Sequence, residues 1–234
     1  MVAGSSNAKI PWQGSKRQLR GVLPDRYALA VETPFPISGD QKLIQIVDAA
    51  LADATRRSKG WLACRKGCTQ CCMGVFAINQ LDRARLQRGL KELAMRDPAC
   101  AESVRRRARE AVQRLSSQFP GDPATGLLGQ SERERQLFEN FGNEEPCPAL
   151  DLVEGTCDLY ESRPMTCRTF GPPLRVEGGG LGVCELCYQD CSEAEVAACE
   201  MVPDPDDMES HLLREIERST GKRGETIVAF ALAA

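Results

Sequence analysis

Four cysteines lie within nine residues of one another in the first half of the chain. Steps of four, three and one residues would place all four on one face of an α-helix, although a turn loosened by Gly67 could also gather them. Because closely packed thiolates repel one another, a cation or a covalent bond is needed to hold them. The pattern therefore favours a metal site over a disulfide framework or a group of packing residues. The four are Cys64, Cys68, Cys71 and Cys72.

Six further cysteines form two later groups that could join the first in space. Each group is too short to surround a buried metal by itself, and joining them would tie distant parts of the chain together. Cys100 and Cys199 stand apart from all three groups, and we interpret them as packing residues. The later predicted ligands are Cys147, Cys157 and Cys167, which are ten residues apart, and then Cys184, Cys187 and Cys191.

These motifs together resemble a known family. The motifs are Cys64-x3-Cys68-x2-Cys71-Cys72, Cys147-Pro148 and Cys157-x2-Tyr160-x2-Arg163-Pro164-x2-Cys167-Arg168. The chain resembles the CxxCxxCC, or YkgJ-like, family, whose members are described as zinc- or iron-chelating. The resemblance extends from Cys64 to about Cys191 and implies a cysteine-bound metal. The first spacing is three residues here and often two in the family, and the family's eighth cysteine could match Cys184 or Cys187.

Zinc and iron–sulfur clusters both accept a ligand set made only of cysteines. The cysteines could make two four-thiolate sites or one site with spare thiols. The Cys-x3-Cys-x2-Cys run favours iron–sulfur, because it has the spacing of the radical-SAM cluster loop, but no barrel-like strand–helix repeat surrounds it. Cations beside the cysteines could offset the thiolate charge by hydrogen bonds to sulfur. These are Arg65, Lys66, Arg163 and Arg168.

Composition limits the fold and the partners. The chain has 234 residues, a net charge of −3 and 5% aromatic residues, so it can bury a sizeable core but offers no strong overall attraction for nucleic acid. Metal crosslinks would strengthen a core with few aromatic side chains. Twelve cysteines without a visible export signal or a long apolar run predict a reducing compartment, the cytoplasm.

Caps and helical periodicity predict a mainly α protein with small β-hairpins, built as an irregular, cysteine-rich, metal-clasped domain. Capping boxes predict helix starts at Ser38, Ser131 and Ser192, and other start signals stand at Asn79 and Asp97. The predicted long helices run over about 39–58, 79–95, 97–119 and 208–221. Hairpins are predicted at 148–160 and 174–183.

Three segments are expected along the chain. Residues 1–36 have four prolines and no period, which is typical of a flexible arm. Residues 37–200 form the helical, cysteine-rich metal-binding domain. Residues 201–234 supply a last amphipathic helix and an apolar tail, which could pack as a helix or strand or bind a partner.

Three functional hypotheses follow. The first is an iron–sulfur or zinc protein with a binding, redox or maturation role. The second is a protein (lysine) methyltransferase-like enzyme, because flagellin lysine methylases carry a similar cysteine motif, but no glycine-rich nucleotide fingerprint follows a clear strand. The third is a structural zinc module that binds an unidentified protein partner. No membrane or nucleic-acid partner is expected, and an arginine-rich stretch at 105–114 is interpreted as a solvated helix face. The single histidine, His211, is interpreted as an exposed residue rather than a ligand.

Overall fold

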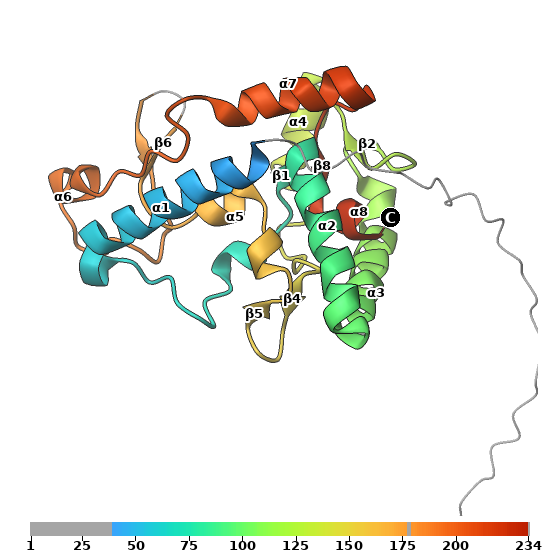
Figure 1. The fold of residues 1–234 in the computed structure, drawn as a ribbon, viewed down its shortest axis with the longest axis horizontal. Helices are drawn as coiled ribbons and strands as arrows, with labels where there is room; N and C mark the ends of the chain where they lie inside the picture. Colours follow the sequence, from blue (N-terminus) through green and yellow to red (C-terminus); the bar gives the residue numbers. More distant parts are fainter. Residues whose placement is uncertain (1–38, 177–178, 234) are drawn as a thin grey trace, which may run out of the picture. The chain divides into compact units, whose positions relative to one another are not determined.

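The structure is a computed structural model that describes residues 39–176 and 179–233. Helices dominate these residues, and every strand is two residues long (Figure 1). The prediction of a mainly α fold with small β-hairpins is confirmed. The predicted N-terminal arm lies outside the described residues. The helices are α1 Asp40–Ser58, α2 Gln80–Arg96, α3 Pro98–Leu115, α4 Glu132–Phe138, α5 Met165–Thr169, α6 Glu193–Ala198, α7 Met208–Thr220 and α8 Val228–Ala233.

The strands pair two by two, and each pair is antiparallel. Three of the pairs are local hairpins, and two of those are the hairpins expected from the sequence. The fourth pair joins residues about 150 apart, Ala77 to Ile227 and Ile78 to Thr226. The pairs are β1 Ala77–Ile78 with β8 Thr226–Ile227, β2 Gly121–Asp122 with β3 Leu127–Leu128, β4 Leu150–Asp151 with β5 Thr156–Cys157, and β6 Leu174–Arg175 with β7 Leu181–Gly182.

Side-chain caps start four helices where the sequence predicted them. The Asn79 side chain accepts hydrogen bonds from two backbone N–H groups of α2, and the Asp97 side chain accepts one at the start of α3. Ser131 and Ser192 form complete capping boxes for α4 and α6. These caps satisfy N–H groups that have no partner within the helix, which fixes where each helix begins.

Helix α1 begins differently from the prediction. Its N-cap is Gly39, with a φ of 109° and no side-chain cap, while the predicted capping residue Ser38 lies outside the described residues. The end of α1 at Ser58 agrees with the sequence, and a 3-10 turn over Lys59–Trp61 then leads into the first cysteine loop.

Helices α2, α3 and α8 form the main apolar core (Figure 1). The apolar tail thus packs as both a strand and a helix. Each fully buried large apolar side chain contributes about 1.5–3 kcal/mol through burial. Two predicted ligands, Cys147 and Cys157, pack against this core. The core therefore supports one side of the segments 62–76 and 145–190, which we call the cysteine region. Core residues include Leu86, Leu90, Leu93, Val104, Ala108, Ala231 and Leu232.

A second core lies where α1 meets α2 and α7. A buried arginine connects the helices here: Arg85 on α2 donates to Asp40 at 2.7 Å and to Asp82 at 2.6 Å. Removing one partner of such a pair leaves a buried charge without compensation, which makes the contact sensitive to mutation. Its apolar members include Leu43, Val47, Leu81, Leu212 and Ile216.

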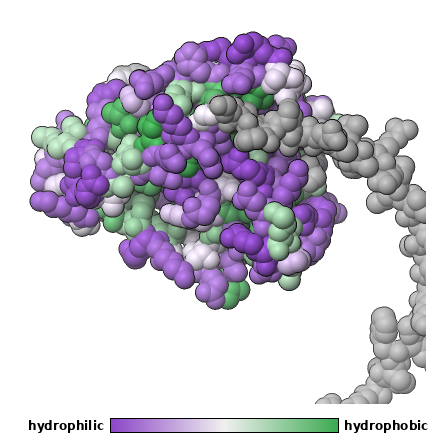
Figure 2. Space-filling model, in the orientation of Figure 1, coloured by the Kyte–Doolittle hydropathy of each residue, from purple (hydrophilic) through white to green (hydrophobic). Residues whose placement is uncertain are grey.

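The visible face of the molecule is mostly hydrophilic, with apolar side chains in scattered patches (Figure 2). Within residues 39–176 and 179–233, no helix combines the length and apolar character needed to cross a membrane.

Candidate metal centre

The first four cysteines lie on turns rather than on one α-helix. Gly67 has a φ of 88°, which a side chain would disfavour, and the Cys68 N–H closes the turn onto the Arg65 carbonyl at 2.9 Å. A 3-10 turn over Gln70–Cys72 then carries the last two thiols. Of the two arrangements that the sequence allowed, the turn loosened by Gly67 is therefore the one that forms.

Backbone pairing brings the second cysteine group to the first. The Cys147 N–H donates to the Cys72 carbonyl at 2.8 Å, next to an antiparallel bridge between Met73 and Pro146. Cys157 lies in β5 and Cys167 in the short helix α5. Residues separated by about 75 positions in the sequence thus become direct neighbours.

Seven of the ten predicted ligands line one cavity of about 600 Å³. Apolar side chains complete much of its wall, including Leu86 from α2 and Val228 from α8. The cavity therefore combines many soft donors with surroundings that limit solvation. The seven are Cys64, Cys68, Cys71, Cys72, Cys147, Cys157 and Cys167.

Without a bound cation, this environment opposes ionisation of most of these thiols. Burial raises the pKa of Cys147 to about 12, and burial and neighbouring thiols also raise the pKa of Cys157 and Cys167. The adjacent pair behaves differently: a hydrogen bond between the two thiols lowers the pKa of Cys71 to about 6 and raises that of Cys72. A metal would reverse the unfavourable charging, because it binds the thiolate form.

The third cysteine group divides. Cys184 and Cys187 are buried beside Trp61 and Leu62, next to the thiol of Cys64. Cys191 packs at the edge of the same cluster, near Glu195 and Cys199. None of the three lines the large cavity.

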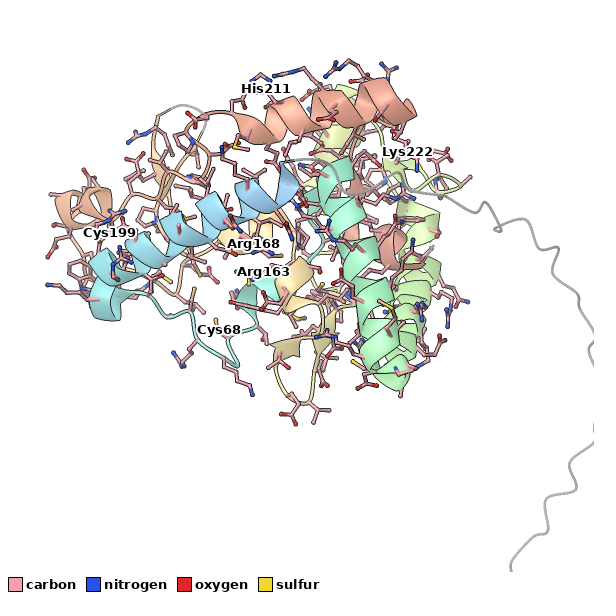
Figure 3. The ribbon with its side chains drawn as sticks, viewed as in Figure 1. Cys68, Arg163, Arg168, Cys199, His211 and Lys222 are labelled. Atoms are coloured by element: carbon pink, nitrogen blue, oxygen red, sulfur yellow. The ribbon has the colours of Figure 1, made fainter. Side chains whose placement is uncertain are left out.

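Cys100 and Cys199 pack as the sequence suggested. Cys100 is half-buried against the α2–α3–α8 core, and Cys199 is buried beside Tyr188. Figure 3 shows Cys199 next to α6, well away from Cys68 on the first cysteine loop.

The two arginines beside Cys167 hold the chain rather than sulfur. Arg168 is buried and donates to both carboxylate oxygens of Asp48, at 2.7 and 2.8 Å, and to the carbonyls of Arg163 and Glu161. All three guanidinium nitrogens of Arg168 thus donate to oxygen acceptors, and among the described residues Arg168 makes no hydrogen bond to sulfur. Arg163 stacks on the Tyr160 ring at 4.0 Å from the ring centre, and its charge lowers the pKa of Cys157 against the effect of burial. Sequence analysis missed Asp48, because nothing local marks a helical aspartate as the partner of an arginine 120 positions away.

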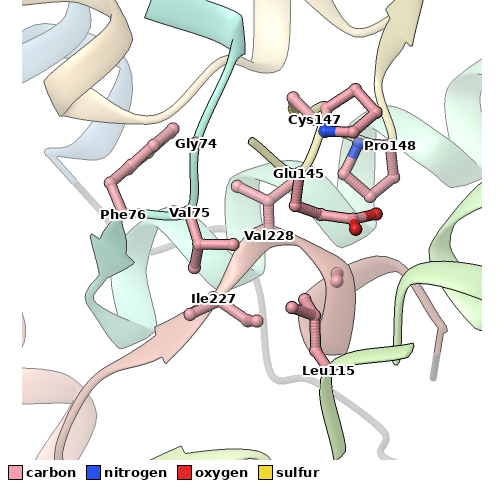
Figure 4. A pocket seen from close by; sticks show the side chains of 11 residues that line it. Gly74, Val75, Phe76, Leu115, Glu145, Cys147, Pro148, Ile227 and Val228 are labelled. Atoms are coloured by element: carbon pink, nitrogen blue, oxygen red, sulfur yellow. The ribbon is translucent and has the colours of Figure 1, made fainter. Parts of the chain in front are cut away.

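Cys147 also borders a second, much smaller cavity (Figure 4). Its volume is about 20 Å³ and its wall is mostly apolar, with Val75, Leu115 and Ile227 among its residues. A space of this size holds no more than about one water molecule. Cys147 is therefore fixed between the large cavity and a tightly packed interior.

A metal would have to draw the thiols closer. In the part of the chain that the structure describes, no three Cys, His, Asp or Glu side chains are already spaced to hold a metal ion together. All twelve cysteines are free thiols, and the donors around the cavity are of the type that zinc and iron–sulfur clusters use. The donor chemistry fits such a group, and closing of the loops around it would couple metal binding to folding.

His211 and the arginines of α3 do not line the large cavity. His211 is exposed on α7 and contacts Arg214 (Figure 3). The arginines of α3 all have acidic neighbours, as expected for a solvated helix face. The pairs are Arg105–Glu102, Arg106–Glu110, Arg107–Asp158, Arg109–Glu102 and Arg114–Glu145.

Comparison with known proteins identifies the cysteine region. The family model described as "CxxCxxCC: Putative zinc- or iron-chelating domain" matches residues 63–173. The match is shorter than the sequence resemblance suggested, because it ends before Cys184, Cys187 and Cys191. Searches of curated proteins and of solved structures found no match. Residues 63–173 thus match the CxxCxxCC family model, which supports a zinc- or iron-chelating role and confirms the family resemblance over that range.

Proposed function

We propose that the chain is an iron–sulfur protein whose cluster occupies the large cavity and serves a redox or binding role. The observation that carries this proposal is the meeting of seven cysteines around one space of about 600 Å³. A single zinc ion needs four donors within a small tetrahedron, whereas a cluster of several iron and sulfur atoms requires a larger enclosure. The size of the cavity therefore favours a cluster.

Five of the thiols form the inner set that would supply the cluster ligands. Each is close enough to others in the set for their charges or hydrogen bonds to change its pKa. Four thiolates hold one [4Fe–4S] cluster, so five candidates are sufficient. The set is Cys71, Cys72, Cys147, Cys157 and Cys167, and we call it the inner thiol set.

The surroundings of the inner thiol set suit a redox centre. Apolar side chains of Phe76, Leu86 and Val228 limit water around the cavity, and the Arg163 charge lies near Cys157. Burial and nearby charge are the protein's means of setting a cluster's reduction potential. The cluster would also crosslink the first cysteine loop, the β4–β5 hairpin and α5.

Anaerobic purification of the full chain, followed by visible spectroscopy, tests the proposal. We expect a broad band near about 400 nm that bleaches on addition of dithionite and returns on oxidation. Cys147→Ser combined with Cys157→Ser leaves only three thiols in the inner thiol set and should abolish the band, while the control variant Cys100→Ser, outside that set, should keep it. A colourless chain with stoichiometric zinc would overturn the iron–sulfur assignment.

A further inference from the structure

Four cysteines outside the inner thiol set gather beside the first cysteine loop. Cys184 and Cys187 are buried in one cluster with Trp61, Leu62 and Ala63, the residues directly before Cys64. The neighbouring thiols of Cys187, Cys68 and Cys184 raise the pKa of Cys64. Cys184 in turn lies near Cys187 and Cys68. We call Cys64, Cys68, Cys184 and Cys187 the outer thiol set.

The outer thiol set consists of two pairs, each carried on a tight turn. In the first pair, three residues separate Cys64 from Cys68, and in the second, two residues separate Cys184 from Cys187. The Cys187 N–H donates to the Cys184 carbonyl at 2.8 Å, which folds the second pair back on itself. Two cysteine pairs with two to four intervening residues are the usual ligand spacing of a four-thiolate zinc site.

Three contacts hold the two turns against each other. The Tyr188 N–H donates to the Trp61 carbonyl at 2.9 Å, and Gln70 Nε2 donates to Glu185 Oε1 at 2.8 Å. The Ala63 N–H points at the Cys187 sulfur, with a nitrogen–sulfur distance of 3.4 Å. A backbone N–H directed at sulfur stabilises a thiolate, and such contacts orient the ligands of metal sites.

Gly171 leaves room for Cys64 in this arrangement. A Cβ atom at Gly171 would come within 2.7 Å of the Cys64 sulfur, and the φ of 120° at Gly171 also disfavours a side chain. The sulfur of Cys64 is thus seated against the backbone at a defined place.

The two thiol sets contact different parts of the chain. In the inner thiol set, the Cys147 N–H donates to the Cys72 carbonyl at 2.8 Å. In the outer thiol set, Cys184 and Cys187 are buried with Trp61, Leu62 and Ala63, directly before Cys64. The Cys-x3-Cys-x2-Cys run is therefore divided after Cys68, and the adjacent cysteines 71 and 72 fall on the inner side.

We propose that Cys64, Cys68, Cys184 and Cys187 form a second metal centre, which binds one zinc ion in a tetrahedral four-thiolate site. This inference rests on the proposed function, because it assumes that the inner thiol set holds a cluster of its own. Two of the four ligands lie beyond the matched domain, so the site closes the segment that follows residue 173 onto the first cysteine loop. Four thiolates leave a net charge of −2 on the zinc centre, which the Ala63 N–H and the neighbouring Arg65 and Lys66 reduce.

Differential alkylation of the unmodified full-length protein tests the two-centre arrangement without any mutation. The anaerobically purified chain is treated with increasing concentrations of a zinc chelator, alkylated and mapped by mass spectrometry. We expect Cys184 and Cys187 to become reactive together with Cys64 and Cys68, while zinc is released and iron and the inner thiol set stay protected. Release of both thiol sets in one step would overturn the proposal.

Paired variants provide the second test, with zinc, iron and acid-labile sulfide measured per chain. Cys184→Ser with Cys187→Ser should reduce zinc at least about tenfold while iron and sulfide are kept. Cys147→Ser with Cys157→Ser should remove iron and sulfide while zinc is kept. The matched control is Cys191→Ser, which should change neither metal.

The outcomes separate the second centre from the proposed function. A chain with iron, sulfide and no zinc would overturn the second centre alone. Zinc at one equivalent without iron, lost in the Cys184/Cys187 variant, would overturn the cluster and keep the zinc site. A chain without metal, in which all twelve thiols react at once, would overturn both.

Discussion

The helical core and the cysteine region of this protein are held together in different ways. Helices α2, α3 and α8 bury aliphatic side chains from all three partners, and caps define where α2 and α3 begin. The cysteine region consists of turns, two-residue strands and short helices. In the cluster around Trp61, three of the four buried members are cysteines and the fourth is Tyr188.

This contrast shows what a metal has to supply. The helical core gains its stability from apolar burial, which needs no cofactor. The cysteine region has little aliphatic surface to bury, and most of its buried thiols resist ionisation when no cation is bound. Metal binding would crosslink a region that buries little aliphatic surface of its own.

Metal removal should produce the largest difference in hydrogen-exchange protection between the two regions. Structural zinc sites in small domains contribute about 10–16 kcal/mol of apparent binding free energy. Loss of the metal should therefore unfold the cysteine region. Hydrogen exchange followed by mass spectrometry should show lost protection over residues 62–76 and 145–190, with α2, α3 and α8 still protected. Returning the metal is the control and should restore protection. Equal protection of the cysteine region with and without metal would contradict the contrast.

A cavity in the helical core should destabilise that core and leave the metal content unchanged. Leu90 is buried in that core, and Leu90→Ala should lower the free energy of unfolding by about 2–5 kcal/mol. Urea unfolding measures the loss, and metal per folded chain should stay the same. The control is Met95→Ala on the same helix, where the side chain is 78% exposed and the loss should stay below about 0.5 kcal/mol. Loss of metal from folded Leu90→Ala would show that the regions are not independent.

The helix starts were predictable from the sequence because their signals are local, whereas the apolar tail at 227–232 was left open between a helix, a strand and a partner-binding segment. Asn79, Asp97, Ser131 and Ser192 each announce a helix start within a few residues, and apolar residues repeat with the helical period. The cysteines could be identified as candidate ligands from their spacing alone.

The arrangement of the cysteine region could not be predicted in the same way. Two-residue strands have no period, so the pairing of Ala77 with Ile227 leaves no local signal. The bridge from Met73 to Pro146 is equally long-range, and it decides which thiols meet. The use of Arg168 on Asp48 rather than on sulfur likewise depends on how α1 packs against α5.

A buried arginine allows a finer test of the cysteine region. Arg168→Gln should leave Asp48 and two carbonyls short of donors, with a loss of about 1–3 kcal/mol in the free energy of unfolding. Because Arg168 follows Cys167 directly, metal affinity should also fall by about tenfold, measured by competition with a chelator. The matched variant Arg109→Gln disrupts an exposed pair with Glu102, so it should cost at most about 1 kcal/mol and leave affinity unchanged. Equal metal affinities in the two variants would show that Arg168 does not stabilise the metal site.

The smallest effect on metal content is expected at the two packing cysteines. Cys100→Ala and Cys199→Ala should leave the metal-to-protein ratio of the folded chain unchanged, because both thiols lie outside the two thiol sets. Cys199 is 2% exposed, so its replacement should still lower stability by about 1 kcal/mol. A fall in metal content for either variant would make that residue a ligand.

X-ray absorption at the iron and zinc edges of the anaerobically purified full-length chain tests the central claim most directly. The claim is that the clustered cysteines hold metal. It predicts an absorption edge for at least one of these metals, with a first coordination shell made only of sulfur. Nitrogen or oxygen ligands in that shell, or a folded chain without either metal, would contradict it.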